Sequence, residues 1–281
     1  MKTSRINLII CTLAIISLVS CKQKTIRTIE KADIEKYYLA ADTSKGSLNL
    51  ELNVEIPVCF DNKSILDTIR NTIISNLFGI EYIKYANDSI IQQFASDLKK
   101  EYKLTNEPIL NEMDEKSLYS FNNEHILDGF SLLNDENIYS YGINRYVFMG
   151  GAHGLNTINY YNFNLKTGKL ITENDLFLKN TVSKLTELIK LRIIEQCNED
   201  KGIKPIKNLE KTDFWIDAIK PNGNFYITDE SLNYVFNPYE IGPYYLGITE
   251  VQIPYERMKN ILKPNATINY LIKKEKIPNS K

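Results

Sequence analysis

The sequence predicts an α+β fold in which helices pack on one face of a mostly antiparallel sheet. Several segments alternate apolar and polar residues with the two-residue period of a strand, and others repeat apolar residues with the period of a helix. The two kinds of segment are clustered along the chain rather than strictly alternating, which favours this class over a parallel α/β sheet. An apolar content of 43 % in 281 residues is ample for a core.

The first 20 residues are typical of an export signal. Lys2 and Arg5 precede an apolar run at residues 8–19, which is too short to cross a bilayer as a permanent helix. The run ends in Leu18-Val19-Ser20-Cys21, a motif that resembles a bacterial lipobox. The resemblance implies cleavage after Ser20 and acylation of Cys21, so we expect a lipoprotein held on a membrane by its lipid. The alternative is an ordinary signal peptide followed by a chance cysteine.

The residues that follow Cys21 indicate where in the cell the protein is held. Lys22, rather than an aspartate, follows Cys21, so the rule for retention in the inner membrane does not apply. We expect a protein of the cell envelope, lipid-anchored at the outer membrane, on a side that the sequence leaves open. Residues 21–47 are polar and carry lysines, and we expect a lipidated tether with a short helix-prone piece at residues 29–40.

Residues 48–135 are expected to form the first half of the folded part. The period-two alternation of Leu48 to Ile56 predicts a half-buried strand, and an apolar residue at every fourth position predicts the helix that follows. The expected elements are a strand at 48–56, a helix at 63–78 capped by Asp61 or Asn62, a helix from about Ser89 to a loop marked by Pro108, and a strand at 125–133.

Residues 136–275 are expected to form the second half, packed with the first as one unit. Gly168, in a turn flanked by apolar residues, predicts a hairpin with a positive φ. The expected elements are strands at 138–149 and 157–165, helices at 181–197 and 211–219, strands at 224–228, 232–236 and 247–253, a short helix beginning at Pro254, and an edge strand at 267–272.

Charge and cysteine content limit the functions and the chemistry. Without its first 20 residues the chain has three more acidic than basic side chains, which argues against a nucleic-acid partner.

Apart from the acylated Cys21, the chain after cleavage has two cysteines, Cys59 and Cys197. An oxidising compartment permits a disulfide between them, but a bridge needs favourable geometry, and we favour two buried thiols.

Motifs that would specify catalysis or a cofactor are missing. Only His125 and His153 are present, and no Cys-x-x-Cys or His-Glu-x-x-His pattern occurs, so we expect no metal. The sequence has neither a Gly-x-Ser-x-Gly elbow nor a phosphate-binding glycine-rich loop. We therefore expect no cofactor and no catalytic residue.

Gly150-Gly151-Ala152-His153-Gly154 is the first candidate cluster, between two expected strands. Its glycines permit positive φ or a close approach, and successive N–H groups could form an anion-binding nest. Gly151 and His153 are therefore candidate ligand-binding residues, and His153 could also transfer protons. The alternative is a structural turn whose histidine bonds a backbone carbonyl.

The loop from Asn237 to Gly247 is the second candidate cluster. Prolines and glycines restrain it, and it carries Tyr239, Tyr244 and Tyr245. Aromatic residues on a rigid loop can stack on sugar rings or anchor a protein partner, so these three are candidate binding residues. The alternative is that the tyrosines fold back and complete the core.

The two clusters carry a resemblance to a known family. The stretch from Gly150 to Phe177 and the run from Phe225 to Tyr255 resemble the extracellular domain of RsiV-type anti-sigma factors and the accessory domain of PdaC-type peptidoglycan deacetylases. The resemblance implies an α+β module that recognises lysozyme in the first family and accompanies a catalytic domain in the second. The sequence shows neither a deacetylase domain nor a sigma-binding segment, so we expect neither activity.

Three hypotheses follow. The first is a non-catalytic, lipid-anchored envelope protein that binds a lysozyme-like protein or peptidoglycan through His153 and the tyrosine loop. The second is an envelope hydrolase that acts on cell-wall glycan with His153 as acid and base, paired with a carboxylate brought near by folding. The third is an inhibitor or sensor of lysozyme.

Overall fold

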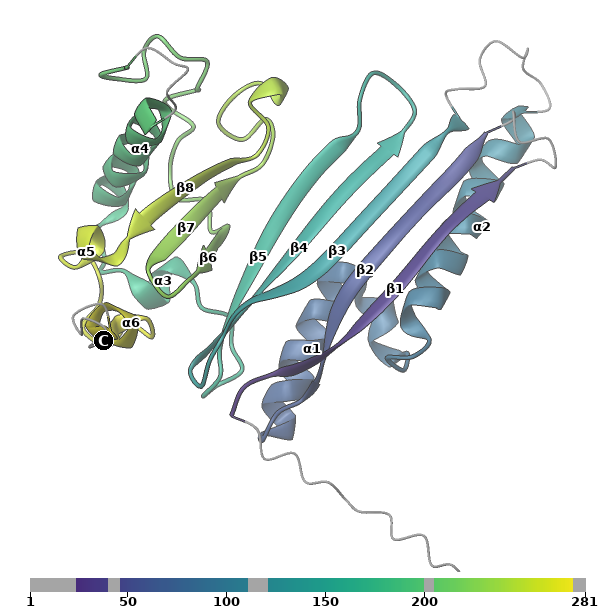
Figure 1. Ribbon diagram of the computed structural model, residues 1–281, viewed down its shortest axis with the longest axis horizontal. Helices are drawn as coiled ribbons and strands as arrows, with labels where there is room; N and C mark the ends of the chain where they lie inside the picture. Colours follow the sequence, from purple (N-terminus) through teal and green to yellow (C-terminus); the bar gives the residue numbers. More distant parts are fainter. Residues whose placement is uncertain (1–23, 40–45, 111–120, 200–204, 275–281) are drawn as a thin grey trace, which may run out of the picture.

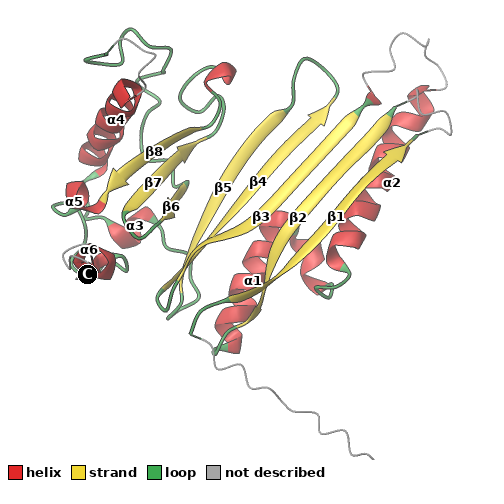
Figure 2. Ribbon diagram, viewed as in Figure 1, coloured by secondary structure: helices red, strands yellow, loops and turns green. Residues whose placement is uncertain are grey.

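Two sheets, each with its own hydrophobic core, form the part of the chain that this computed structural model describes: residues 24–39, 46–110, 121–199 and 205–274. Both sheets consist mostly of antiparallel pairs, and helices pack against them (Figures 1 and 2). The α+β class is confirmed. The prediction of one sheet is wrong, because the strands of the second half form a sheet of their own.

The larger sheet has five strands in sequence order: β1 (Arg27–Tyr38), β2 (Ser47–Cys59), β3 (Asn123–Asn134), β4 (Ile138–Met149) and β5 (Leu155–Asn164). Only the β2–β3 pair is parallel. A parallel pair needs a long crossover, and here the chain between the two strands contributes the helices. We call this sheet and its helices the N-terminal unit.

Helices α1 (Lys63–Leu77) and α2 (Ile90–Leu110), joined through the short 3₁₀ helix η1 (Ile80–Lys84), cover one face of the larger sheet (Figure 1). The expected cap is confirmed, since Ile65 donates its backbone N–H to the Asn62 side chain at 3.2 Å. The apolar side chains of α1 and of β2 are almost completely buried against each other because their helical and strand periods put them on facing surfaces: Ile65, Ile69, Ile73 and Leu77 from the helix, and Leu48, Leu50, Leu52, Val54 and Ile56 from the strand.

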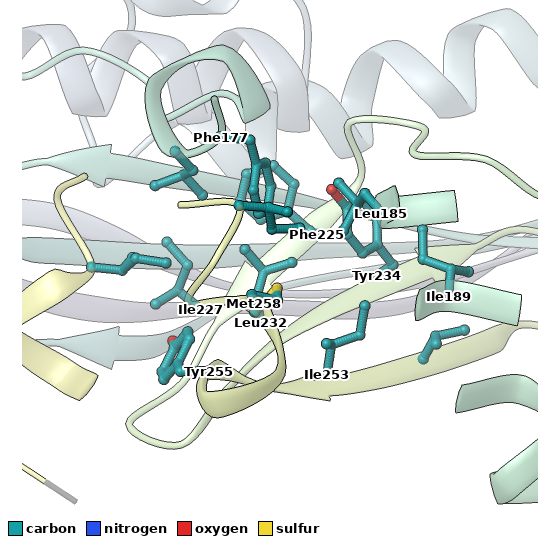
Figure 3. Packing of buried hydrophobic residues seen from close by; sticks show 14 of the residues in the cluster. Phe177, Leu185, Ile189, Phe225, Ile227, Leu232, Tyr234, Ile253, Tyr255 and Met258 are labelled. Atoms are coloured by element: carbon teal, nitrogen blue, oxygen red, sulfur yellow. The ribbon is translucent and has the colours of Figure 1, made fainter. Parts of the chain in front are cut away.

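The smaller sheet and its helices form the C-terminal unit. Its strands are β6 (Phe225–Ile227), β7 (Ser231–Phe236) and β8 (Thr249–Pro254), and its helices are α3 (Glu173–Leu176), α4 (Val182–Glu199), η3 (Tyr244–Leu246), α5 (Tyr255–Met258) and α6 (Asn269–Lys274). Figure 3 shows its core, in which Leu185 and Ile189 of α4 face Tyr234 and Ile253 of the sheet. The hairpin that leads from β5 into this unit is confirmed, with a φ of 72° at Gly168.

Side-chain amides join the two units along the outer edge of β5. Asn224 and Asn237 accept from the backbone N–H groups of Tyr160 (3.0 Å) and Ile158 (2.7 Å), and both donate to the Ile158 carbonyl. Asn162, which is 3 % exposed, donates to the Phe225 carbonyl of β6 at 2.7 Å and accepts from the Ile227 N–H. The amides occupy the hydrogen-bonding positions that a sixth strand would otherwise fill.

Residues 27–38 do not belong to the expected tether. Instead of a tether with a helical piece at residues 29–40, Arg27–Tyr38 form strand β1, paired antiparallel with β2 along its whole length. Residues 21–23 and 40–45 lie outside the described residues. The division at residue 135 is also wrong, because β3 and β4 on either side of it pair with each other. The two units divide after β5.

Three further elements differ from expectation. Pro108 lies inside α2 rather than in a loop, where near the helix end it removes only one N–H from the helical ladder. The expected helix at 211–219 is an irregular segment, in which the Trp215 N–H bonds the Ile241 carbonyl. The expected edge strand at 267–272 is helical, and its buried residues Ile268 and Leu271 have helical spacing.

No disulfide joins Cys59 to Cys197, which packs beside the core of the C-terminal unit. Cys59, on β2, is nevertheless disulfide-bonded, so the expectation of a thiol is wrong there. Across residues 24–274, setting aside the undescribed gaps, no helix has the length and apolar character needed to span a bilayer.

Replacing Asn162 with Ala should destabilise the folded chain by about 3 kcal/mol, because the Phe225 carbonyl, the Ile227 N–H and the Ser140 hydroxyl would lose a buried partner together. Urea unfolding of the two purified proteins measures this difference. The matched control is Asn159→Ala, an exposed asparagine of the same strand, which should change the unfolding free energy by less than about 0.5 kcal/mol. Equal losses would show that the buried amide does not stabilise the junction.

Candidate ligand-binding site

Glycine geometry shapes the loop between β4 and β5. Gly150 and Gly151 have φ of 84° and 101°, in the region that favours glycine. Gly154 is buried under the Tyr146 ring, and a Cβ atom at that position would lie 2.4 Å from the ring. The turn therefore depends on glycine at both ends, and it leaves the His153 side chain exposed between them.

The loop between β7 and β8 is held by its own backbone and by Asn222, which precedes β6. The Asn237 carbonyl accepts from the Glu240 N–H at 3.0 Å, and Asn222 donates to the Glu240 carboxylate at 2.8 Å. Tyr239 has a φ of 70°, which is unusual for a residue with a side chain. Pro243 then leads into η3, which carries Tyr244 and Tyr245. The loop is thus ordered by hydrogen bonds within it and by the bond from Asn222, in agreement with the order that its proline and glycine content predicts.

The two predicted clusters meet. Both loops extend from the same end of their sheets (Figure 1), and the rings of His153 and Tyr244 stack with centroids 3.8 Å apart and an interplanar angle of 20°. The Tyr244 hydroxyl donates to the Gly154 carbonyl at 2.7 Å. One tyrosine thereby contacts both the histidine and the backbone of the other loop.

Two more tyrosines extend this surface. The Tyr239 ring lies 5.7 Å from that of Tyr244, and Tyr239 and Tyr245 are 51 % and 66 % exposed. Asp213 accepts a hydrogen bond from the Tyr245 side chain, which raises the pKa of its hydroxyl. We call His153, Tyr239, Tyr244 and Tyr245 the aromatic platform. It presents exposed rings on a backbone fixed by both units, an arrangement suited to binding by stacking and apolar contact.

The surroundings of His153 give little support for acid–base chemistry. Its Nδ1 atom lies 3.0 Å from the carbonyl oxygen of Gly154, the next residue in the chain. Glu240, the carboxylate on the facing loop, is engaged by Asn222 and Asn237. Within the described ranges, no three His, Cys, Asp or Glu side chains are grouped so as to hold a metal ion.

The other histidine lies elsewhere. His125, on β3, lines a hollow of ≈ 200 Å³ with Glu101, Tyr102 and Met149, on the face covered by α2. Burial lowers the pKa of the His125 imidazole, opposed by the nearby Glu101 carboxylate. Sequence reasoning did not single out His125. It belongs to no motif, and the sequence of a strand does not show whether its histidine lines a surface hollow or packs in the core.

Sequence reasoning also missed the asparagines that bring the two loops together. Asn162, Asn224 and Asn237 have no motif in common, and their roles depend on pairing between residues more than sixty positions apart. Asparagine is abundant in turns. Asn224 and Asn237, which flank β6 and β7, therefore look like ordinary loop residues in the sequence.

Two family descriptions match separate parts of the chain. Residues 44–156 match the family described as deacetylase PdaC. Residues 174–256 match the family described as a protein of unknown function, DUF3298. The chain resembles RsiV-like and PdaC-like proteins. The first match lies within the N-terminal unit and the second within the C-terminal unit, and together they confirm the resemblance inferred from the sequence.

Individual relatives agree with these matches. The chain is 30 % identical over 112 residues to the anti-sigma-V factor RsiV of Bacillus subtilis, and 28 % identical over 108 residues to an esterase of Mycobacterium tuberculosis. Each match covers 38 % of this chain, but only 36 % of RsiV and 44 % of the esterase. The chain thus spans less than half of either relative.

Solved structures extend the similarity to both units. A DUF3298 family member from Bacteroides fragilis is 26 % identical, with a TM-score of 0.78 over 88 % of this chain and 97 % of that one. A family member from Pseudomonas aeruginosa, 15 % identical with a TM-score of 0.55 over 85 % of this chain and 96 % of that one, shows the fold alone.

Replacing Tyr244 with Phe should loosen the Gly150–Gly154 loop without unfolding the chain. The change removes the hydrogen bond to the Gly154 carbonyl, worth about 1 kcal/mol, and keeps the ring that stacks on His153. Hydrogen exchange of the backbone amides of residues 150–155 should become faster. The control is Tyr239→Phe, since that exposed tyrosine does not bond the loop; equal acceleration in both variants would contradict the role given to Tyr244.

Proposed function

We propose that this chain is a lipid-anchored protein of the cell envelope that binds a lysozyme-like protein through the aromatic platform and does not act as an enzyme. The observation that carries the proposal is the stack of His153 on Tyr244 beside the exposed rings of Tyr239 and Tyr245. The similarity to RsiV-like and PdaC-like proteins supports the envelope setting.

The platform has the properties of a protein-binding surface. Tyrosine offers a large contact area with few rotatable bonds, so little side-chain entropy is lost when a ring is fixed against a partner. Here the stack and the hydrogen bond to Gly154 fix two of the rings beforehand. Such preorganisation reduces the free-energy cost of binding, and exposed aromatic anchors are where binding energy concentrates in interfaces.

A lysozyme-like ligand is favoured by two considerations. The relative RsiV matches this chain at 30 % identity, and the resemblance to its family implies a domain that recognises lysozyme. The excess of three acidic side chains in the chain after residue 20 also favours a basic partner over an acidic one. A peptidoglycan strand is the other ligand that exposed rings would accept, by stacking on its sugars.

An envelope hydrolase is the second candidate, and the similarity to an esterase favours it. His153 would have to serve as acid and base. Its ring is instead stacked on Tyr244, with Nδ1 directed at a backbone carbonyl, and the carboxylate of Glu240 is held by two asparagines. The geometry therefore favours binding over catalysis.

Replacing Tyr239 and Tyr245 together with Ala should weaken binding of the mature protein to lysozyme by at least about tenfold, since two exposed anchors are lost. Surface plasmon resonance with immobilised lysozyme measures the dissociation constant. His153→Ala combined with Tyr244→Ala should weaken binding further, with an unchanged circular-dichroism spectrum as evidence that the fold persists.

The matched control removes a cation–aromatic pair on the N-terminal unit, where the Lys84 ammonium lies 5.1 Å from the Tyr85 ring centroid. Lys84→Ala with Tyr85→Ala should leave the affinity unchanged. Full binding by both platform variants would exclude the platform as the site. If the wild type bound purified peptidoglycan but not lysozyme, and the platform variants lost that binding, the ligand would be peptidoglycan and the platform would remain the site. Ester or glycan hydrolysis that disappears with His153→Ala would favour the hydrolase.

The lipid anchor is a separate prediction. Cys21→Ala should release the protein from the membrane, because acylation needs the cysteine sulfur. Mass spectrometry of the N-terminal peptide of the membrane-bound wild type should show cleavage after Ser20 and acyl chains on Cys21. A Cys21 peptide without acyl mass, freed from the rest of the chain only after reduction, would show a disulfide in place of the lipid.

A further inference from the structure

One face of the five-stranded sheet is not covered by any described helix. Helices α1 and α2 pack on the opposite face, where the apolar side chains of β2 enter the core, and both helices lie behind the strands in Figure 1. Side chains of a strand alternate between its two faces. The register of the five strands therefore assigns these half-exposed or exposed side chains to the uncovered face, which we call the open face: Glu30, Ala32, Ile34 and Lys36 of β1, Asn49, Glu51 and Asn53 of β2, Glu124, Ile126, Asp128 and Phe130 of β3, Asn144, Tyr146 and Phe148 of β4, and Asn156, Ile158 and Tyr160 of β5.

The large apolar side chains in the middle of the open face belong to neither hydrophobic core: Ile126, Phe130, Tyr146, Phe148 and Tyr160. Gly142 allows two of these rings to lie over β4, because a Cβ atom there would lie 2.7 Å from the Phe130 ring and 3.0 Å from the Tyr160 ring. Tyr160 in turn contacts Tyr226 of β6, with centroids 4.6 Å apart. A row of aromatic rings thus crosses the open face, and a contiguous apolar surface of this kind is typical of a binding surface.

The acidic excess of the chain is concentrated on the same face. One ammonium group, that of Lys36, lies there against four carboxylates: Glu30, Glu51, Glu124 and Asp128. The whole chain after residue 20 has an excess of only three acidic side chains, so the excess on the open face is as large as that of the chain. A second copy of the chain or an anionic lipid surface would meet like charge here, whereas a basic protein would be attracted.

A hollow of ≈ 270 Å³ lies between the acidic strands of the open face. The carboxylates of Glu30 and Asp128 line it together with Asn53 and the Phe130 ring. Carboxylates beside an aromatic ring are suited to the cationic end of a long side chain, whose apolar stem can lie along the ring. The hollow therefore fits a lysine or arginine side chain of a partner.

The open face is continuous with the aromatic platform. The Tyr146 ring lies against Gly154, whose carbonyl oxygen accepts the hydrogen bond from Tyr244. The platform has four side chains, whereas a stable protein interface takes about 20–30 residues from each partner. The open face offers the further area, since β2 is three strand spacings, or roughly 14 Å, from β5.

We propose that the open face is the larger part of the interface with a basic protein, and that the aromatic platform is its margin. This inference rests on the proposed function, because it assigns the same protein partner to an additional surface. The carboxylates of the open face attract the partner, and the rings of the platform hold it after contact. Charge complementarity acts mainly on the association rate, and packed contacts act mainly on the dissociation rate, so the two contributions can be measured separately.

Neutralising two carboxylates of the open face tests the attraction. Glu51→Gln with Glu124→Gln in the mature protein should lower the association rate with immobilised basic lysozyme about tenfold at low ionic strength, measured by surface plasmon resonance. The difference from wild type should disappear at about 1 M salt, where charges are screened within roughly 3 Å. The matched control, Asp67→Asn with Glu187→Gln, removes the same charge from exposed positions on α1 and α4 and should leave the rate within about twofold of wild type.

The outcomes separate this inference from the proposed function. An equal loss in the control would show that net charge, and not the open face, attracts the partner, and would overturn the inference. An unchanged rate in the open-face variant, with binding still lost in the platform variants, would overturn the inference and leave the proposed function intact. A wild type that does not bind lysozyme would overturn both.

Photo-cross-linking locates the bound partner directly. Asn53→Cys, on the open face of β2, should cross-link to bound lysozyme when it carries a benzophenone maleimide. Thr68→Cys, at an exposed position on α1, should not, because that helix lies on the opposite side of the sheet. Wild type treated in the same way measures the background from native cysteines. A cross-link from neither variant, or equal yields from both, would overturn the inference.

Discussion

The amide network at the outer edge of β5 is the interaction on which the rest of the structure depends. A strand edge next to another unit needs partners for its N–H and C=O groups. Asn224 and Asn237 supply these partners from the C-terminal unit. In the other direction, Asn162 of β5 bonds the backbone of β6. The contact joins the units without making the two sheets continuous, so each sheet keeps its own core.

The network also positions the aromatic platform. Asn237 directly follows β7 and begins the loop that carries Tyr239 and Tyr244. Its partner Ile158 lies on β5, just after the Gly150–Gly154 loop. The same hydrogen bonds that hold the units together therefore fix the separation of the two loops. A ligand that contacts both loops would bind a surface whose halves are already in place, without the free-energy cost of bringing them together.

Sequence patterns predicted the strands and helices that have one buried and one exposed face, such as β2 and α1. They failed for β1, whose covered face carries Lys31, Asp33 and Glu35. These charges are tolerated because β1 lies at the sheet edge, where Lys31 reaches Asp88, and such compensation is not visible in the local sequence. Both candidate clusters of the site were predicted from composition. Their contact was not, because it depends on long-range asparagine hydrogen bonds that have no local pattern.

The two edges of the five-stranded sheet differ in what lies beside them. Asparagine side chains bond the β5 edge, whereas α2 runs along the β1 side, where Lys99 pairs with Glu35. The platform lies at the β5 side, four strand spacings from β1, or roughly 19 Å. A ligand on the platform would therefore contact the loops of both units, whose separation the asparagine hydrogen bonds already fix, and binding would require no movement of the outer strand.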